Sequence, residues 1–268
     1  MSELGGGGGG KARKVADYAR LAFGWRSVLA RTAGYCTASV AARAITRSEA
    51  PSQQLMHRFF RGALPQLGIH VEAEGPEKIR PATPCIIAVN HNSYLDIPCV
   101  GVLLDFDYKW VSKKEVFGWP FVGWHLWACG HIWVDRERKD NSERLAAEFH
   151  RVLGNGASIL MFPEGTRSPD GRLLAFKRGA FVTAVMENVP VLPIGIDGTE
   201  RLMEKGSLEF PRGQDKTVRI KVMDPVRPPA DGGFDDRVRW MRDRTREAMV
   251  AALDDLRGAP GAAERPTI

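Results

Sequence analysis

One histidine and one aspartate, His91 and Asp96, stand five positions apart just after the apolar run Cys85-Ile86-Ile87-Ala88-Val89. The apolar and β-branched residues of that run predict a buried strand. His91 would then leave the sheet at its carboxyl edge, where open α/β sheets usually bind their ligands. A neutral imidazole at that edge, oriented by a carboxylate, can take a proton from an alcohol. The pair therefore indicates an enzyme.

A structural role for Asp96 explains the same residues. On one continuous helix, five positions would separate the two side chains by roughly 140°, so a catalytic pair requires a turn between them. Pro98 suits the first turn of a helix, and Asp96 would then be the N-cap just before it. In that interpretation His91 is an ordinary loop residue. This motif alone leaves both interpretations open.

Two further loops place arginines directly after predicted strands. The strand over residues 131–134 ends at Asp135-Arg136, and the strand over residues 158–162 leads into Pro163-Glu164-Gly165-Thr166-Arg167. In a parallel sheet both loops share the edge of His91, and the two arginines would form a charged clamp suited to a phosphate. Glu164 would orient a hydroxyl or pair with an arginine. Taken singly, each loop also fits a plain turn or a surface ion pair.

Four ordered motifs make roughly residues 65–225 resemble the glycerolipid acyltransferase family, of the bacterial 1-acyl-sn-glycerol-3-phosphate (lysophosphatidate) acyltransferase type. The motifs are N-H-x-x-x-x-D at 90–96, G-x-I-x-[IV]-D-R at 130–136, F-P-E-G-T-R-S at 162–168 and V-P-[VI]-x-P-[VI] at 189–194. The family requires no covalent acyl-enzyme, and the sequence agrees, because it has no G-x-S-x-G nucleophile elbow.

The resemblance implies O-acyl transfer from acyl-CoA or acyl-acyl carrier protein to lysophosphatidate, giving phosphatidate for phospholipid biosynthesis. It implies that His91 is the general base and that Asp96 holds the imidazole tautomer. The residues implied to bind the acceptor are Arg136, Glu164, Gly165, Thr166 and Arg167. A backbone N–H or a nearby lysine would stabilise the oxyanion, and the residues implied around the oxyanion or acyl group are Asn90, Lys113, Lys114 and Pro193. No metal and no cofactor are implied.

Other functions fit the same residues. The acceptor could be another lysolipid, such as lyso-ornithine lipid or a lysophospholipid with a larger head group. From a different class, a His-Asp pair could activate water in a lipid or thioester hydrolase. A third possibility is a non-catalytic membrane-binding module.

The 268 residues predict an α/β fold with a mixed, largely parallel sheet flanked by helices, and an N-terminal amphipathic helical segment. This follows from alternating patterns along the chain. Strands are predicted at 85–89, 108–112, 131–134, 158–162, 190–196 and 218–223, and helices at 97–105, 141–153, 176–187 and 234–256.

The chain is predicted to consist of four segments. Residues 1–10, with six glycines, are predicted to form a flexible leader. Residues 11–64 are predicted to form a basic amphipathic helical segment that docks on a membrane. Residues 65–257 would form the catalytic domain and 258–268 a loose tail. Residues 1–64 carry ten Lys and Arg against three acids, within a total net charge of +6.

The basic charge favours an anionic lipid surface. A solvated helical face packed on the catalytic domain is the alternative. Nucleic acid is disfavoured as a partner because no recognised binding module accompanies the charge. The expected location is peripheral, at the cytoplasmic face of the cell membrane.

Residues 116–134 hold no Asp, Glu, Lys or Arg and four of the seven tryptophans. Glycines, Pro120 and two histidines argue against a transmembrane span. Two interpretations remain open for Trp119, Trp124 and Trp127. The three side chains could form an aromatic belt or apolar groove at the membrane interface, or they could lie in the protein core. The four cysteines lack C-x-x-C spacing, which favours reduced thiols over a disulfide or zinc framework.

Overall fold

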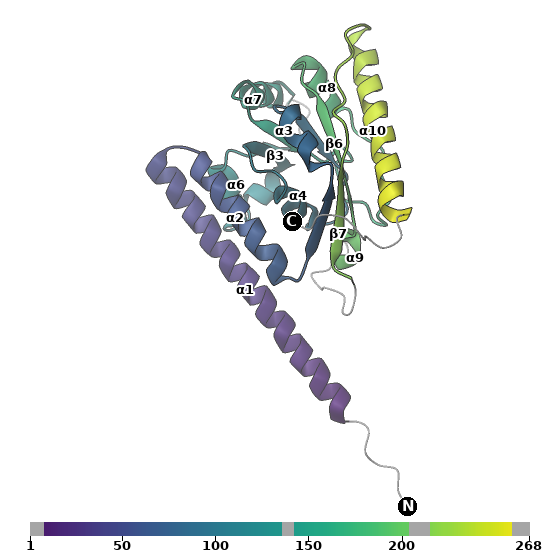
Figure 1. Ribbon diagram of the computed structural model, residues 1–268. Coiled ribbons are helices and arrows are strands. Elements are labelled where there is room, and N and C mark those ends of the chain that lie inside the picture. The colour runs from purple at the N-terminus through teal and green to yellow at the C-terminus, as the bar shows by residue number, and fades with distance from the viewer. Residues whose placement is uncertain (1–7, 136–141, 204–214, 259–268) are drawn as a thin grey trace, which may run out of the picture.

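A seven-stranded sheet with helices on both faces forms the centre of the computed structural model, which describes residues 8–135, 142–203 and 215–258 (Figure 1). Its strands are β1 (His70–Glu74), β2 (Ile86–Val89), β3 (Tyr108–Lys113), β4 (Ile132–Val134), β5 (Ser158–Met161), β6 (Val191–Asp197) and β7 (Thr217–Val222), in the order β1-β7-β6-β2-β5-β3-β4. All neighbouring pairs are parallel except β6 and β7. The predicted mixed, largely parallel sheet is confirmed.

The helices alternate with these strands. They are α1 (Gly8–Thr46), α2 (Ala50–Gln66), a 3₁₀ turn η1 (Pro76–Lys78), α3 (Ile79–Ala82), α4 (Asp96–Gly101), α5 (Lys114–Phe117), α6 (Val122–Ala128), α7 (Ser142–Gly154), α8 (Gly179–Met186), α9 (Thr199–Leu202) and α10 (Phe234–Gly258). Every described helix falls short of the combination of length and hydrophobicity that a membrane span requires.

The central strands are buried on both faces. All four residues of β2, all four of β5 and all seven of β6 are buried, as near-continuous apolar runs in parallel sheets usually are. Because β6, β2 and β5 are adjacent, their carboxyl ends open at one edge of the sheet. The loops at that edge can therefore meet, whatever their separation in the sequence.

Two apolar cores attach the helices to the sheet. On one face, Met56 and Phe60 of α2 join Cys99 and Val100 of α4 in a single cluster with β2, β6 and β7. The packing is tight, since a Cβ on Gly101 would lie 2.5 Å from the Phe60 ring. On the other face α7, α8 and α10 form the second cluster, so both sheet faces are covered (Figure 1).

The two N-terminal helices pack against each other, and α1 also packs against α6. Tyr35 of α1 contacts Phe59 of α2, with 5.6 Å between ring centroids. Ser52 of α2 donates to the carbonyl of Ser39, and the Ser39 hydroxyl lies 2.8 Å from Nδ1 of His125 in α6. The N-terminal part of α1 extends beyond the rest of the protein (Figure 1). The helix begins at Gly8, so the last three glycines of the predicted flexible leader are helical.

Most predicted elements are present, with shifted ends. The six predicted strands and the predicted helices all occur, but the helix expected over 97–105 ends at Gly101 and that expected over 176–187 begins only at Gly179. The edge strand β1 was not predicted. The four cysteines are free thiols, buried in the structure. The predicted tail lies outside the described residues from 259 onward.

Candidate active site

The three central strands supply the residues around His91. His91 follows β2, the loop over 162–174 follows β5, and Thr199 follows β6. Nδ1 of His91 lies 2.8 Å from Oδ2 of Asp96. Asp96 is fully buried, whereas the His91 side chain is 16% exposed. The two side chains therefore form the predicted pair, with the imidazole at the border between solvent and core.

The turn that the pair requires is held by Asp96 itself. Its Oδ2 also accepts hydrogen bonds from the backbone N–H groups of Asn92 at 2.7 Å and Ser93 at 2.9 Å. These groups precede Asp96, whereas an N-cap accepts from residues that follow it. The N-cap of α4 is Leu95, without a side-chain cap. The alternative of a helix cap is therefore wrong: the carboxylate folds the loop back so that it reaches the imidazole.

Phe162 and Glu164 hold His91 from the neighbouring loop. The Phe162 ring stacks on the imidazole with 3.9 Å between centroids and 18° between planes. The backbone N–H of His91 donates to Oε1 of Glu164 at 2.8 Å, and the N–H of Leu174 donates to Oε2 at 2.9 Å. The backbone N–H of Ser168 in turn donates to the carbonyl of His91 at 2.7 Å. His91 is thus fixed through both its ring and its backbone.

Glu164 is buried and accepts a backbone N–H group at each carboxylate oxygen. It is 3% exposed, and its burial raises the pKa of the carboxyl group, while the two N–H donors lower it. Sequence reasoning expected Glu164 to orient a hydroxyl or to pair with an arginine. Because each carboxylate oxygen accepts a backbone N–H, we interpret Glu164 as a link between the loop of His91 and its own loop.

Gly165 and Arg167 of this loop are half-buried. Gly165 has φ +70°, and a Cβ there would lie 2.9 Å from Cε of Lys177, so both conformation and space favour glycine. Arg167 places its guanidinium carbon 4.0 Å above the ring of Tyr94, which belongs to the loop of His91. Thr166 between them is exposed. Arg167 therefore contacts the loop of His91, whereas Arg136 is outside the described residues.

The residues expected around the oxyanion or acyl group have different partners in the structure. Asn90 donates from Nδ2 to the carbonyl of Ile196 and accepts the N–H of Ile196 at Oδ1, so it extends the β2–β6 pairing as part of the scaffold. Pro193 is buried within β6, opposite Ala88. Lys114 pairs with Asp135 at 3.2 Å, while Lys113 is exposed at the carboxyl end of β3.

Sequence reasoning missed the contribution of α9. The Thr199 hydroxyl lies 2.5 Å from Oδ1 of Asp96, and Oε2 of Glu200 accepts from Nδ2 of Asn92 at 3.3 Å. The sequence did contain a sign of this contribution. Gly198-Thr199-Glu200 follows the predicted apolar strand over 190–196, as the loops that begin at Asp135 and Pro163 follow theirs.

Among the described residues, one group has the side chains of a metal site. The ligand atoms of His125, Cys129 and His131 lie within 4.8 Å of one another. However, Nδ1 of His131 accepts the backbone N–H of Trp110 at 3.1 Å, so the proton of the neutral ring is on Nε2. Neither nitrogen of His131 then offers a lone pair to a metal. Burial lowers the pKa of His125 to about 4, consistent with neutral side chains in the core between α1 and α6.

Comparison with known proteins finds related sequences and a similar structure. A sequence model of the family described as Acyltransferase matches residues 70–197. The human 1-acyl-sn-glycerol-3-phosphate acyltransferase alpha is 31% identical over 190 residues, or 70% of this chain and 65% of that protein. An uncharacterized acyltransferase of Schizosaccharomyces pombe is 32% identical over 193 residues, or 71% of this chain and 67% of that protein. This chain thus spans slightly less than two thirds of the human relative.

The likeness extends to the fold. The crystal structure of the 1-acyl-sn-glycerophosphate (LPA) acyltransferase PlsC from Thermotoga maritima is similar with a TM-score of 0.76 and 26% sequence identity. The match covers 93% of this chain and 100% of that one. The similarity therefore includes helices outside residues 70–197.

Proposed function

Since this chain belongs to the acyltransferase family, we propose that it transfers a fatty acyl group to the free hydroxyl of lysophosphatidate, giving phosphatidate. The observation that carries the proposal is the 2.8 Å contact between Nδ1 of His91 and the buried carboxylate of Asp96. A carboxylate that accepts a hydrogen bond from Nδ1–H leaves the lone pair of Nε2 for the substrate hydroxyl.

The reaction needs no group beyond the two substrates. The hydroxyl oxygen attacks the thioester carbonyl of acyl-CoA or acyl-acyl carrier protein while Nε2 of His91 takes its proton. The C–S bond then breaks, and the imidazolium returns the proton to the leaving thiolate. The candidate donors to the oxyanion are a backbone N–H and Lys113, because Lys114 is paired with Asp135.

Arg167 is our candidate for binding the acceptor phosphate, together with Arg136. Its position over Tyr94, in the loop of His91, supports this role. A guanidinium can bind a phosphate through two parallel hydrogen bonds. A lysolipid with an uncharged head group would gain little from it.

We expect Arg167→Ala to raise the KM for lysophosphatidate about 10-fold or more, since a charged hydrogen bond is lost. The measurement is an acyl-transfer assay over lysophosphatidate, lyso-ornithine lipid and a lysophospholipid with a larger head group, with both thioester donors. Arg172→Ala is the matched control, because Arg172 is exposed in the same loop and pairs with Asp170.

Two outcomes of the same assay contradict the proposal. An unchanged KM in Arg167→Ala, together with preference for another lysolipid, would remove lysophosphatidate as the acceptor. Release of free fatty acid from acyl-CoA, unaffected by added lysolipid, would indicate a hydrolase.

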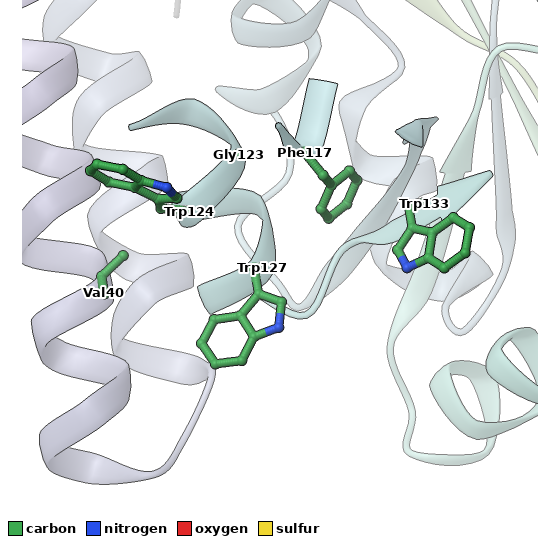
Figure 2. A pocket seen from close by; sticks show the side chains of 6 residues that line it. All are labelled: Val40, Phe117, Gly123, Trp124, Trp127 and Trp133. Carbon is green, nitrogen blue, oxygen red and sulfur yellow. The ribbon is translucent and has the colours of Figure 1, made fainter. Parts of the chain in front are cut away.

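We further propose that the protein is peripheral at the cytoplasmic face of the membrane and docks through a tryptophan surface made by Trp119, Trp124 and Trp127. These side chains are 45%, 53% and 70% exposed, so the core alternative is not supported. Trp124 and Trp127 of α6 line an open pocket of about 400 Å³ with Val40 of α1 (Figure 2). Indole rings favour the headgroup level of a bilayer.

The position of this surface supports its role in delivering the acceptor. Trp119 contacts Tyr94 edge to face, with 6.5 Å between ring centroids, and Tyr94 carries Arg167 on its ring. A lysolipid in the membrane leaflet that touches the tryptophan surface would thus have its phosphate near Arg167. The free buried cysteines are compatible with a reducing compartment.

The double variant Trp124→Ala/Trp127→Ala is expected to weaken binding to anionic phospholipid vesicles by about 10-fold or more, since two large apolar surfaces no longer enter the interface. Co-sedimentation with vesicles measures the effect. Trp240→Ala is the matched control, because Trp240 is 46% exposed on α10. Equal binding of the double variant and the control would show that the docking surface lies elsewhere.

A further inference from the structure

Thr199 makes a direct contact with the carboxylate that orients His91. It is the first residue of α9, immediately after β6 and Gly198, and it belongs to none of the four motifs that carry the family resemblance. Its hydroxyl donates to Oδ1 of Asp96 at 2.5 Å. Both residues are fully buried. An ionised carboxylate only accepts hydrogen bonds, so the direction of this one is determined.

The contact engages the second oxygen of Asp96. Oδ2 holds Nδ1 of His91 and the N–H groups of Asn92 and Ser93. Turning the carboxylate about its Cβ–Cγ bond, a torsion that is otherwise broad, would displace both oxygens from their hydrogen-bond partners. With Thr199 at Oδ1, the plane of the carboxylate is defined at both ends. The direction in which Oδ2 meets the imidazole is then defined as well.

The same segment contacts the loop of His91 at two more positions. Glu200 accepts from Nδ2 of Asn92 at 3.3 Å, and the Ser93 hydroxyl donates to the carbonyl of Met203 at 3.1 Å. We call residues 198–203 the brace segment. It thus reaches three residues of the loop, namely Asn92, Ser93 and Asp96.

The brace segment is itself anchored in the protein core. Asp197, at the end of β6, is 2% exposed and accepts from Nε of Arg257 at 2.8 Å and from Nη2 of Arg201 at 3.1 Å. Gly198 has φ +102°, and a Cβ there would lie 2.8 Å from the carbonyl oxygen of Thr217. The start of α9 is therefore fixed by α10 and by β7, and Thr199 approaches Asp96 from a rigid base.

We propose that Thr199 is a positioning residue that orients Asp96, and through it His91, for proton transfer. The inference rests on the proposed acyl transfer. Because Thr199 contacts the orienting carboxylate, its loss affects the reacting step and leaves acceptor binding through Arg167 largely unchanged.

The test compares Thr199→Val, which removes the hydroxyl at nearly constant volume, with Thr199→Ser, which keeps it. We expect Thr199→Val to lower kcat about 10- to 100-fold, as for loss of a hydrogen bond to a charged group, with the acceptor KM within about twofold. Thr199→Ser should recover most of kcat. Thr183→Val is the matched control, since Thr183 is a buried threonine of α8 whose hydroxyl donates to Gly179.

A second measurement is independent of activity. The Nδ1–H of His91 should give a low-field proton NMR signal, assigned by its loss in His91→Gln. We expect Thr199→Val to broaden or shift this signal and Thr199→Ser to keep it. Urea unfolding of each variant reports whether it is folded, and Thr199→Ala replaces Thr199→Val if the latter is not.

The outcomes separate this inference from the proposed function. A folded Thr199→Val protein with kcat within about twofold of wild type, or with an unchanged His91 signal, overturns the role of Thr199. A wild-type protein that transfers no acyl group to any lysolipid overturns the proposed function, and the NMR comparison then still decides whether Thr199 orients the pair.

Discussion

Replacing His91 with alanine is expected to lower kcat for acyl transfer about 10²- to 10⁴-fold, the range that a positioned general base contributes. The imidazole is the group whose Nδ1 is held by the buried Asp96 and whose ring is held by Phe162. Its removal leaves the acceptor hydroxyl without a base. Steady-state kinetics with lysophosphatidate and a thioester donor measure the loss.

Two further variants test whether the loss of activity is specific to the His91–Asp96 pair. Asp96→Asn should lose activity on a similar scale, because an amide that presents its N–H₂ to Nδ1 selects the wrong tautomer. His150→Ala should be nearly neutral, since His150 is exposed and pairs with Glu187 on the surface. If His91→Ala keeps more than about a tenth of wild-type kcat, His91 is not the general base. A non-catalytic membrane module would show no turnover in the wild type either.

Replacing Glu164 with glutamine is the second large effect that we expect. The carboxylate accepts the N–H of His91 with one oxygen and the N–H of Leu174 with the other. Glutamine has only one acceptor oxygen, so its NH₂ group would face one of the two N–H donors. A buried donor left without an acceptor costs about 1–3 kcal/mol. We expect a lower unfolding midpoint in urea and a fall in kcat of about 10-fold or more, because the backbone of His91 shifts.

The control for this variant is Glu247→Gln, since Glu247 lies on the surface of α10 and pairs with Arg244 one turn away. It should change neither stability nor activity measurably. Wild-type kcat in a destabilised Glu164→Gln protein would mean that the link between the loops serves folding only. A raised acceptor KM with unchanged kcat and stability would instead support the original prediction that Glu164 contacts the acceptor.

The strength of each local pattern decided which elements could be predicted. The strands β2, β5 and β6 are short, continuous apolar runs, and such runs identify buried strands. The strand β1, His-Val-Glu-Ala-Glu, has only two buried side chains and lies at the edge of the sheet. Its formation depends on pairing with β7, which is far away in the sequence and leaves no local sign.

The ends of two helices could not be predicted from local sequence either. The α4 helix was expected to continue to residue 105, but it ends at Gly101, where Phe60 of α2 packs directly on the glycine. The α8 helix begins later than expected, after Lys177, whose backbone N–H donates to the carbonyl of Pro163 in the loop over residues 162–174. In both places a tertiary contact, which the local sequence does not reveal, lies at the boundary.

The tryptophans of residues 116–134 could not be assigned from their spacing. An indole suits a core and an interface equally well, because it joins a large apolar ring to one N–H donor. Only the placement of α6 at the surface beside α1 leaves Trp124 and Trp127 exposed (Figure 2).

Residue types and spacing were enough to predict the chemistry of the candidate site: a histidine followed five positions later by a carboxylate, and an arginine-bearing loop, both after apolar strands. That much is local, because a parallel sheet brings its strand ends to one edge wherever the strands stand in the chain. The tertiary structure alone decided what each carboxylate does. Asp96 turns back onto His91 and meets Thr199 from 103 positions away, and Glu164 joins two loops through backbone N–H groups. A buried carboxylate takes whichever donors the fold places around it, and those donors are backbone groups and distant side chains that residue types and spacing do not reveal.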